Sequence, residues 1–213
     1  MTDGAAVWTV VVGAGRGSRF GGLKQYEDIG GTRIIDRSVS VARSAGSQVV
    51  VVVPGADVER EGGVAGGESR AASVRAGLAA VPAEAEIICV HDAARPFATV
   101  ELFERVIAAV RAGADGAVPG MPVSDTIKVV HSVDGELEVS STPDRSTLIA
   151  VQTPQAFRAD VLRAAHAGGA EGTDDASLVE IAGGRVVIVE GEATNRKITT
   201  AEDLAWARGV TAS

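Results

Sequence analysis

Four short apolar runs constrain the fold of this chain more than any other feature of its sequence. They cover residues Val7–Val12, 49–53, 87–90 and 186–189 and are rich in β-branched side chains, which favour strands. None of them alternates cleanly between apolar and polar residues. Each is therefore expected to be a strand that is buried on both faces, as the central strands of parallel sheets are.

Helical patterns follow the first three of these runs, at about residues 33–45, 70–81 and 99–112. Ser69 and Thr99 stand just before the second and third patterns, where their hydroxyls would cap the helices. Strands that alternate with helices predict βαβ units. We therefore expect an α/β fold with a mostly parallel sheet and helices on both of its faces.

Residues at about 121–150 do not continue this alternation of strands and helices. Loosely alternating apolar residues surround a turn at Asp134 and Gly135, a pattern typical of a β-hairpin or arm. An arm that projects from an α/β body cannot bury both of its faces alone, so we expect it to pack on a partner subunit. No linker or repeat divides the rest of the chain, which predicts a single domain over residues 1–213.

Charge and cysteine content narrow the functional classes. The 20 basic and 28 acidic residues give a net charge of −8, which argues against DNA or RNA as a partner but leaves room for a small phosphorylated ligand. The lone cysteine, Cys89, cannot form an internal disulfide, which fits a cytoplasmic location. We recognise no signal peptide, and no apolar run approaches the ~20 residues that span a bilayer, so no membrane contact is expected.

A glycine-rich loop, residues 13–19, directly follows the first predicted strand. It matches neither common phosphate-binding loop, because the dinucleotide fingerprint needs glycine where Ser18 stands and the P-loop needs lysine where Leu23 stands. What remains is a loop whose glycines let backbone N–H groups approach an anion, accompanied by cations such as Arg19 and Lys24. This combination suits a triphosphate; the alternative is an ordinary turn with solvated basic residues.

Two further motifs follow the second and third predicted strands. The pair Gly66 and Gly67 precedes a helix and could fit around a flat nucleotide base, or could form an ordinary loop. Residues 91–96 read HDAARP. There the carboxylate of Asp92 could bind Mg²⁺, and the guanidinium of Arg95 could bind a phosphate through two hydrogen bonds. The alternative is that Asp92 and Arg95 form a structural salt bridge.

A fourth polar motif, residues 194–199, follows the last predicted strand and precedes a helix expected from Thr200 to about Gly209. It could bind a ligand or form a solvated turn. The sequence shows no nucleophile elbow and no Cys/His spacing typical of a metal site. Phosphoryl chemistry by positioning and charge neutralisation needs neither, and the four motifs together favour it.

Taken in order, the motifs resemble the 2-C-methyl-D-erythritol 4-phosphate cytidylyltransferase family of the non-mevalonate isoprenoid pathway. The matching pieces are residues 13–19, 24–26, 66–70, 73–74, 90–96, 122–128, 144–145, 153–155, 173–174, 195–199 and 202–204. The resemblance implies a Rossmann-like nucleotidyltransferase fold and a homodimer joined by the arm. It also implies transfer of a cytidylyl group from CTP to 2-C-methyl-D-erythritol 4-phosphate, with Mg²⁺ and release of pyrophosphate.

This resemblance also implies roles for individual residues. The catalytic residues would be Arg19, Lys24, Arg145 and Lys197, of which the first two would stabilise charge on the α-phosphate during in-line attack. CTP would be held by Gly13, Ala14, Gly15, Gly17, Gly66, Gly67, Ser73, Asp92 and Ala93. The acceptor would be held by Asp92, Arg95, Thr126, Arg145, Thr153, Thr173 and Lys197, and Mg²⁺ by Asp92 and Asn195. Because Thr126 and Arg145 lie on the predicted arm, they could act in the neighbouring subunit's site.

Two other functions stay open at this stage. A cytidylyltransferase for another polyol phosphate, such as ribitol 5-phosphate, would differ in only a few acceptor contacts. A nucleotide-binding module without catalysis would bind CTP and release no pyrophosphate. The cations Arg19, Lys24 and Lys197 argue against the second, because binding alone does not need cations at the reacting centre.

Overall fold

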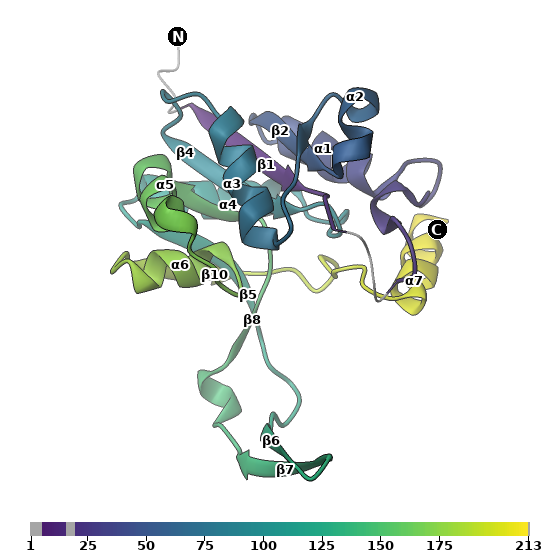
Figure 1. Ribbon diagram of the computed structural model, residues 1–213, viewed down its shortest axis with the longest axis vertical. Coiled ribbons are helices and arrows are strands. Elements are labelled where there is room, and N and C mark those ends of the chain that lie inside the picture. The colour runs from purple at the N-terminus through teal and green to yellow at the C-terminus, as the bar shows by residue number, and fades with distance from the viewer. Residues whose placement is uncertain (1–5, 16–19, 213) are drawn as a thin grey trace.

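The computed structural model describes residues 6–15 and 20–212. An eight-stranded sheet forms its centre, and a two-stranded hairpin projects from it (Figure 1). The strands of the sheet are β1 (Val7–Val12), β2 (Gln48–Val53), β3 (Val64–Ala65), β4 (Ile87–Asp92), β5 (Gly116–Pro122), β8 (Ile149–Val151), β9 (Gln155–Arg158) and β10 (Val186–Glu190). The helices are η1 (Lys24–Tyr26), α1 (Ile34–Ser44), α2 (Val58–Glu61), α3 (Arg70–Ala80), α4 (Val100–Arg111), α5 (Ala159–His166), α6 (Asp175–Ile181) and α7 (Ala201–Thr211), with short 3₁₀ turns between some of them.

Most strands of the sheet run parallel. Their order is β10-β5-β9-β4-β1-β2-β3, and β8 pairs with the end of β5. Strands β4, β1, β2 and β3 are parallel neighbours, as are β5 and β10, whereas β9 runs antiparallel between β4 and β5. The predicted mostly parallel sheet is therefore confirmed. Strand β9 was not predicted, because a run of four residues is too short for periodicity to identify.

The four predicted strands correspond to β1, β2, β4 and β10, and one expectation about them is wrong. Strand β4 is buried along its whole length. Strand β10, however, is the edge strand of the sheet, and the side chain of Ile188 on it is 52% exposed. An apolar run alone does not distinguish an edge strand from a central one, because that depends on which other strands pair with it.

The predicted helix starts are confirmed by their hydrogen bonds. The Ser69 hydroxyl accepts a bond from the N–H of Ala72 at 3.0 Å, and the Thr99 hydroxyl accepts one from the N–H of Leu102 at 3.1 Å. Helix α7 begins after Thr200 as predicted and extends two residues past the predicted end. None of the helices in the described part of the chain is long and apolar enough to cross a bilayer.

Apolar clusters cover both faces of the sheet. Val10 of β1 packs in the cluster that includes α3, α5 and α6, whereas its neighbour Val11 packs in the cluster that includes α1 and α4. Successive side chains of a strand point to opposite faces, so β1 contributes to both layers. A smaller cluster, which includes Ile29, Ile198 and Leu204, joins α7 to the rest of the protein.

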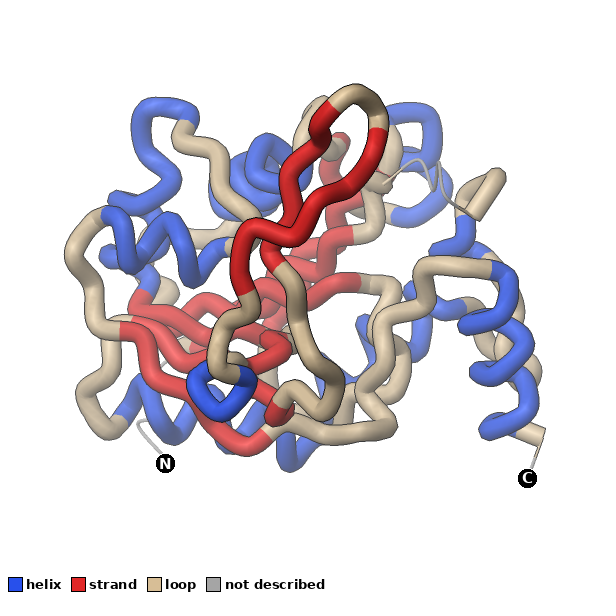
Figure 2. The backbone as a smooth tube through the Cα atoms, turned by 90° about the horizontal axis from the view of Figure 1, so that it is seen from below, coloured by secondary structure: helices blue, strands red, loops and turns tan. Residues whose placement is uncertain are grey.

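The predicted arm is an antiparallel hairpin of β6 (Val129–Val133) and β7 (Glu136–Ser141), seen in Figures 1 and 2. Its turn uses Asp134 and Gly135 with φ values of 50° and 88°, the left-handed conformation that two-residue hairpin turns require. The apolar side chains of β7 are not covered by other described residues. Leu137, for example, is 73% exposed.

Asp203 anchors the start of α7. Its Oδ2 accepts hydrogen bonds from the N–H and hydroxyl of Thr199, at 2.8 Å each, and from those of Thr200, at 2.9 and 3.0 Å. Partial burial raises the pKa of Asp203, but these hydrogen bonds outweigh burial and lower the pKa to about 2. The ionised carboxylate therefore stabilises the segment that leads into α7.

The substitution Asp203→Asn should lower the free energy of unfolding by about 1 kcal/mol near neutral pH, because it removes the charge from this cap. The pKa of Asp203 is depressed below its ordinary 3.8, so the stabilisation is fully present above about pH 4 and is lost as the pH falls toward 2. Urea titrations of both proteins at neutral pH and near pH 3 measure the difference.

The neighbouring substitution Glu202→Gln is the control, because Glu202 is an exposed acid in the same helical turn. It should stay within about 0.5 kcal/mol of the wild type. A loss equal to that of Asp203→Asn would show that general charge near the helix start, rather than the cap, stabilises α7.

Candidate active site

A pocket of about 470 Å³ lies beyond the carboxyl ends of β1 and β4. Segments from five parts of the chain line it: the loop after β1, η1, the loop before α3, the end of β4 and the loop after β10. The lining residues are Val12, Gly13, Ala14, Gly15, Phe20, Lys24, Gln25, Gly67, Glu68, Ser69, Arg70, Ser73, Asp92, Ala93, Ala94, Lys197 and Thr199. This is the edge of an open α/β sheet at which ligands bind.

Two glycine-containing loops meet at one wall of the pocket. A Cβ atom at Gly66 would overlap the Cβ of Ala14 and lie 2.9 Å from the hydroxyl of Ser73. That hydroxyl donates to the carbonyl of Ser69 at 2.9 Å and accepts from the N–H of Gly67 at 3.2 Å. Glycine at position 66 thus lets the loop before α3 pack directly against the loop after β1.

The carboxylate of Asp92 is the centre of charge in the pocket. It is 8% exposed and lies between two cations: Lys197 Nζ is 2.6 Å from Oδ2, and Arg70 Nε is 3.3 Å from Oδ1. Burial raises the pKa of Asp92, but the charges of Arg70 and Lys197 outweigh burial and hold the pKa well below its usual range. Asp92 is therefore ionised at neutral pH although it is buried.

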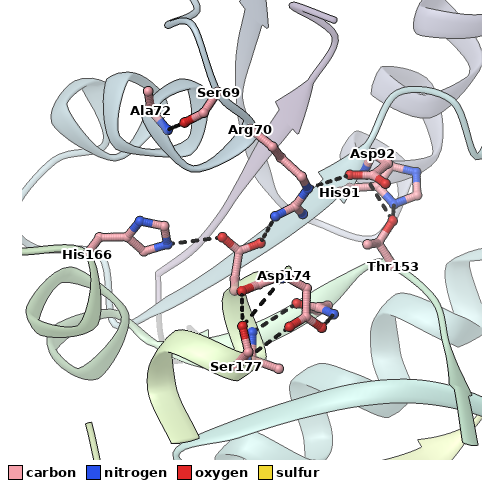
Figure 3. Close-up of polar contacts among 12 residues, drawn as sticks. Ser69, Arg70, Ala72, His91, Asp92, Thr153, His166, Asp174 and Ser177 are labelled. Carbon is pink, nitrogen blue, oxygen red and sulfur yellow. Dashed lines mark hydrogen bonds and ion pairs between the residues drawn. The ribbon is translucent and has the colours of Figure 1, made fainter. Parts of the chain in front are cut away.

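Thr153 supports Asp92 from behind the pocket. Its Oγ1 accepts a hydrogen bond from the backbone N–H of Asp92 at 3.0 Å and lies 3.2 Å from Nδ1 of His91 (Figure 3). Burial lowers the pKa of His91 to about 4, so this imidazole is neutral at neutral pH. Thr153, predicted to hold the acceptor, is itself buried and does not line the pocket.

Asn195 and Arg95 lie in the same supporting layer. Arg95 donates from Nη1 to the backbone carbonyl of Asn195 at 2.7 Å. The Asn195 side chain donates to the carbonyl of Thr153 at 2.9 Å and to Oε1 of Gln152 at 3.2 Å, while its Oδ1 is buried without a hydrogen-bond partner in the described structure. These contacts join the loop after β10 to the segment between β8 and β9. Neither Arg95 nor Asn195 lines the pocket.

Three predicted acceptor residues lie away from the pocket of their own chain. Thr126 and Arg145 are exposed on the arm, where Arg145 donates from Nη1 to the carbonyl of Ser124 at 2.8 Å. The arm points away from the sheet (Figure 1). Thr173 is exposed just before α6.

The other predicted residues are grouped by whether the structure describes them and whether they line the pocket. Two of them, Gly17 and Arg19, lie outside the described residues. Those that the structure brings together in the pocket are Gly13, Ala14, Gly15, Lys24, Gly67, Ser73, Asp92, Ala93 and Lys197. Gly66 packs against Ala14 and is not a lining residue itself.

Arg70 is the most important lining residue that the sequence reasoning missed. It is the first residue of α3, directly after the cap that Ser69 was predicted to form. A signal was available, because the first turn of a helix that follows a ligand-binding loop commonly faces the ligand. Phe20 and Gln25 also line the pocket, and no sequence pattern pointed to Phe20.

The site fits Mg²⁺ only if a bound nucleotide supplies most of the ligands. No three His, Cys, Asp or Glu side chains of the described chain are grouped so that they could hold a metal. Mg²⁺ commonly keeps several waters and binds one or two carboxylates together with substrate phosphates. Asp92, as a single ionised carboxylate in the pocket, suits that mode.

Comparison with known proteins identifies the family. The model of the family "2-C-methyl-D-erythritol 4-phosphate cytidylyltransferase" matches residues 7–212. The chain belongs to this family. It is therefore a cytidylyltransferase, an enzyme of the nucleotidyltransferase class, and the family's substrates are CTP and methylerythritol phosphate. The fold and family expected from the sequence are confirmed.

Relatives of known name agree over nearly the whole chain. The cytidylyltransferase of Rhodococcus opacus is 45% identical, with 99% of this chain and 97% of that protein covered. A bifunctional IspD/IspF enzyme of Clavibacter michiganensis is 44% identical over 95% of this chain, which spans 54% of that longer protein. The crystal structure of the Thermus thermophilus cytidylyltransferase, 34% identical, superposes with a TM-score of 0.82 over 98% of this chain and 100% of that one.

The glycine contact makes a direct prediction about stability. The substitution Gly66→Ala should lower the free energy of unfolding by about 1–3 kcal/mol, because the new methyl group overlaps Ala14 and crowds Ser73. Gly15→Ala is the matched control, since no described atom lies within 4 Å of a Cβ at that position. Denaturant titration of the free proteins measures both. Equal stabilities of the two variants would contradict the close approach of the loops.

Proposed function

We propose that this pocket transfers a cytidylyl group from CTP to the phosphate of 2-C-methyl-D-erythritol 4-phosphate. The products would be 4-diphosphocytidyl-2-C-methyl-D-erythritol and pyrophosphate. One observation carries the proposal: an ionised, nearly buried Asp92 paired with Lys197 and Arg70, in a pocket walled by glycine loops. The family to which the chain belongs indicates the reaction, and we assign that reaction to this charged pocket.

Catalysis in this pocket would rest on positioning and charge. Phosphoryl transfer needs no side-chain nucleophile, because the acceptor phosphate attacks the α-phosphate and pyrophosphate leaves. Lys24 lines the pocket, which supports its assignment to the charge that develops on the α-phosphate in the transition state. Lys197 lines the pocket too, which supports its assignment to positioning the acceptor phosphate. Glycines 13 and 15 would let the triphosphate approach the backbone closely. Arg19, which is assigned the same role as Lys24, lies outside the described residues.

Asp92 would hold Mg²⁺ together with the phosphates of CTP. The metal would neutralise phosphate charge when bound. Asp92 is ionised and faces the pocket, which supports this role. Asn195, the second proposed ligand, has an unpartnered buried oxygen but lies outside the pocket lining, so its role as a ligand stays a prediction.

The arm would join two copies of the chain. The exposed apolar side chains of β7, Leu137 and Val139 among them, need a cover, and a second subunit would supply it. Thr126 and Arg145 would then reach the partner's pocket, since both are exposed in the segments that flank the hairpin of β6 and β7. A cytoplasmic location is part of the same proposal and is supported by the single buried free thiol of Cys89.

Pyrophosphate release with CTP, Mg²⁺ and methylerythritol phosphate tests the reaction. Arg19→Ala and Lys24→Ala should each lower kcat by about 10²–10³, the usual cost of losing one charge stabiliser. Arg43→Ala, at the exposed end of α1, is the control and should leave kcat unchanged. Turnover of ribitol 5-phosphate without turnover of methylerythritol phosphate would favour the alternative acceptor. CTP binding without any pyrophosphate release would favour a non-catalytic module.

A mixed-subunit experiment tests whether Arg145 acts across the dimer. We expect Arg145→Ala and Lys24→Ala homodimers to be nearly inactive. Co-expressed and separated by two affinity tags, the heterodimer should regain activity, because one of its pockets then has an intact Lys24 and an intact partner arm. An inactive heterodimer would show that Arg145 serves its own chain. A monomer in light scattering would overturn the dimer itself.

A further inference from the structure

A row of ionisable side chains continues from the pocket into the protein, beyond the residues that the proposed reaction uses. Arg70 Nη1 lies 2.8 Å from Asp175 Oδ2, and Asp175 Oδ1 lies 3.0 Å from Nε2 of His166. Figure 3 shows His166 and Arg70 reaching toward the same carboxylate from opposite sides. With Asp92 and Lys197, the row joins α5, α6, α3, β4 and the loop after β10.

Asp175 is buried yet is not part of the pocket. Its side chain is 1% exposed and that of His166 is 2% exposed, whereas Arg70 lines the pocket. A carboxylate in such a position is costly unless it is paired, so the Arg70 guanidinium and the His166 ring must both contribute to its stability.

The guanidinium of Arg70 forms ion pairs with two carboxylates. An arginine fork commonly binds one carboxylate through two parallel hydrogen bonds. Here Nε is paired with Asp92 and Nη1 with Asp175. This pairing leaves Oδ2 of Asp92 to Lys197, which lies 2.6 Å away.

We propose that Asp175 is a positioning residue for nucleotide binding, which acts through Arg70. By pairing with one guanidinium nitrogen of Arg70, Asp175 prevents Arg70 from binding Asp92 through two of its nitrogens. Asp92 and Lys197 then keep the arrangement that receives CTP, and His166 orients Asp175 from the other side. The inference rests on the proposed function in that it takes CTP as the ligand of the pocket.

A more exposed pair between the same two parts of the fold provides a matched control. Arg75, one turn and a half further along α3, lies 2.9 Å from Glu171 in the segment before α6. The Arg75 and Glu171 side chains are 28% and 56% exposed, and exposed ion pairs contribute little. Arg75→Gln therefore cuts an ion pair between α3 and the same neighbouring segment without touching the buried row.

A double-mutant cycle tests the proposal. Asp175→Asn, Arg70→Met and the double variant are compared with the wild type by calorimetric titration with CTP and by steady-state kinetics. Asp175→Asn should raise the Kd and KM for CTP about tenfold or more. In the Arg70→Met background the same substitution should change CTP affinity less than twofold, because the residue through which it acts is gone. Arg75→Gln should stay within twofold of the wild type.

A merely structural role for Asp175 predicts a different result. The substitution would then cost the same factor in both backgrounds, or lower the melting temperature with no change in CTP affinity, and either outcome overturns the proposal. Should Asp175→Asn fail to fold, His166→Leu replaces it in the cycle, with a rise in CTP Kd expected only where Arg70 is present. Wild-type protein that binds CTP but releases no pyrophosphate would refute the proposed function, while the binding cycle would still decide this inference.

Discussion

The ion pairing of the buried Asp92 carboxylate is the interaction on which the rest of this structure depends. A carboxylate that is almost out of contact with water is stable only when cations compensate it. Its two cations come from distant parts of the chain, since Arg70 lies 22 residues before Asp92 and Lys197 lies 105 residues after it. The start of α3, the end of β4 and the loop after β10 must therefore meet at one point. That meeting point is the pocket.

The topology of the sheet makes this meeting possible. Parallel strands end at the same edge of the sheet, which places the loops after β1 and β4 next to each other. The arm contributes indirectly. After the excursion through β6 and β7 the chain returns through β8 and β9, and the segment between them carries Thr153, which binds the backbone of Asp92. The segment through which the chain returns to the sheet after the arm thus supports the centre of the site.

The sequence predicts the site best for polar residues that follow the ends of predicted strands. Asp92 and Lys197 stand just beyond predicted strands, and both were assigned to one pocket that the structure contains. The sequence does not single out Arg70, because this residue directly follows a helix cap and its two carboxylate partners are remote in sequence. The expected burial of Ile188 fails for a related reason, because nothing local indicates that β10 lacks a second neighbour.

The sequence by itself determined the strands β1, β2, β4 and β10, the helices α1, α3, α4 and α7, the caps at Ser69, Thr99 and Thr200, the hairpin turn and the order of the motifs. These features arise from interactions between residues that are close along the chain, which composition and periodicity record. Only the tertiary structure decided that Arg70 would form ion pairs with both Asp92 and Asp175, and that Thr153 would support the site from behind. Such pairings depend on how distant segments pack, and no local pattern encodes that packing.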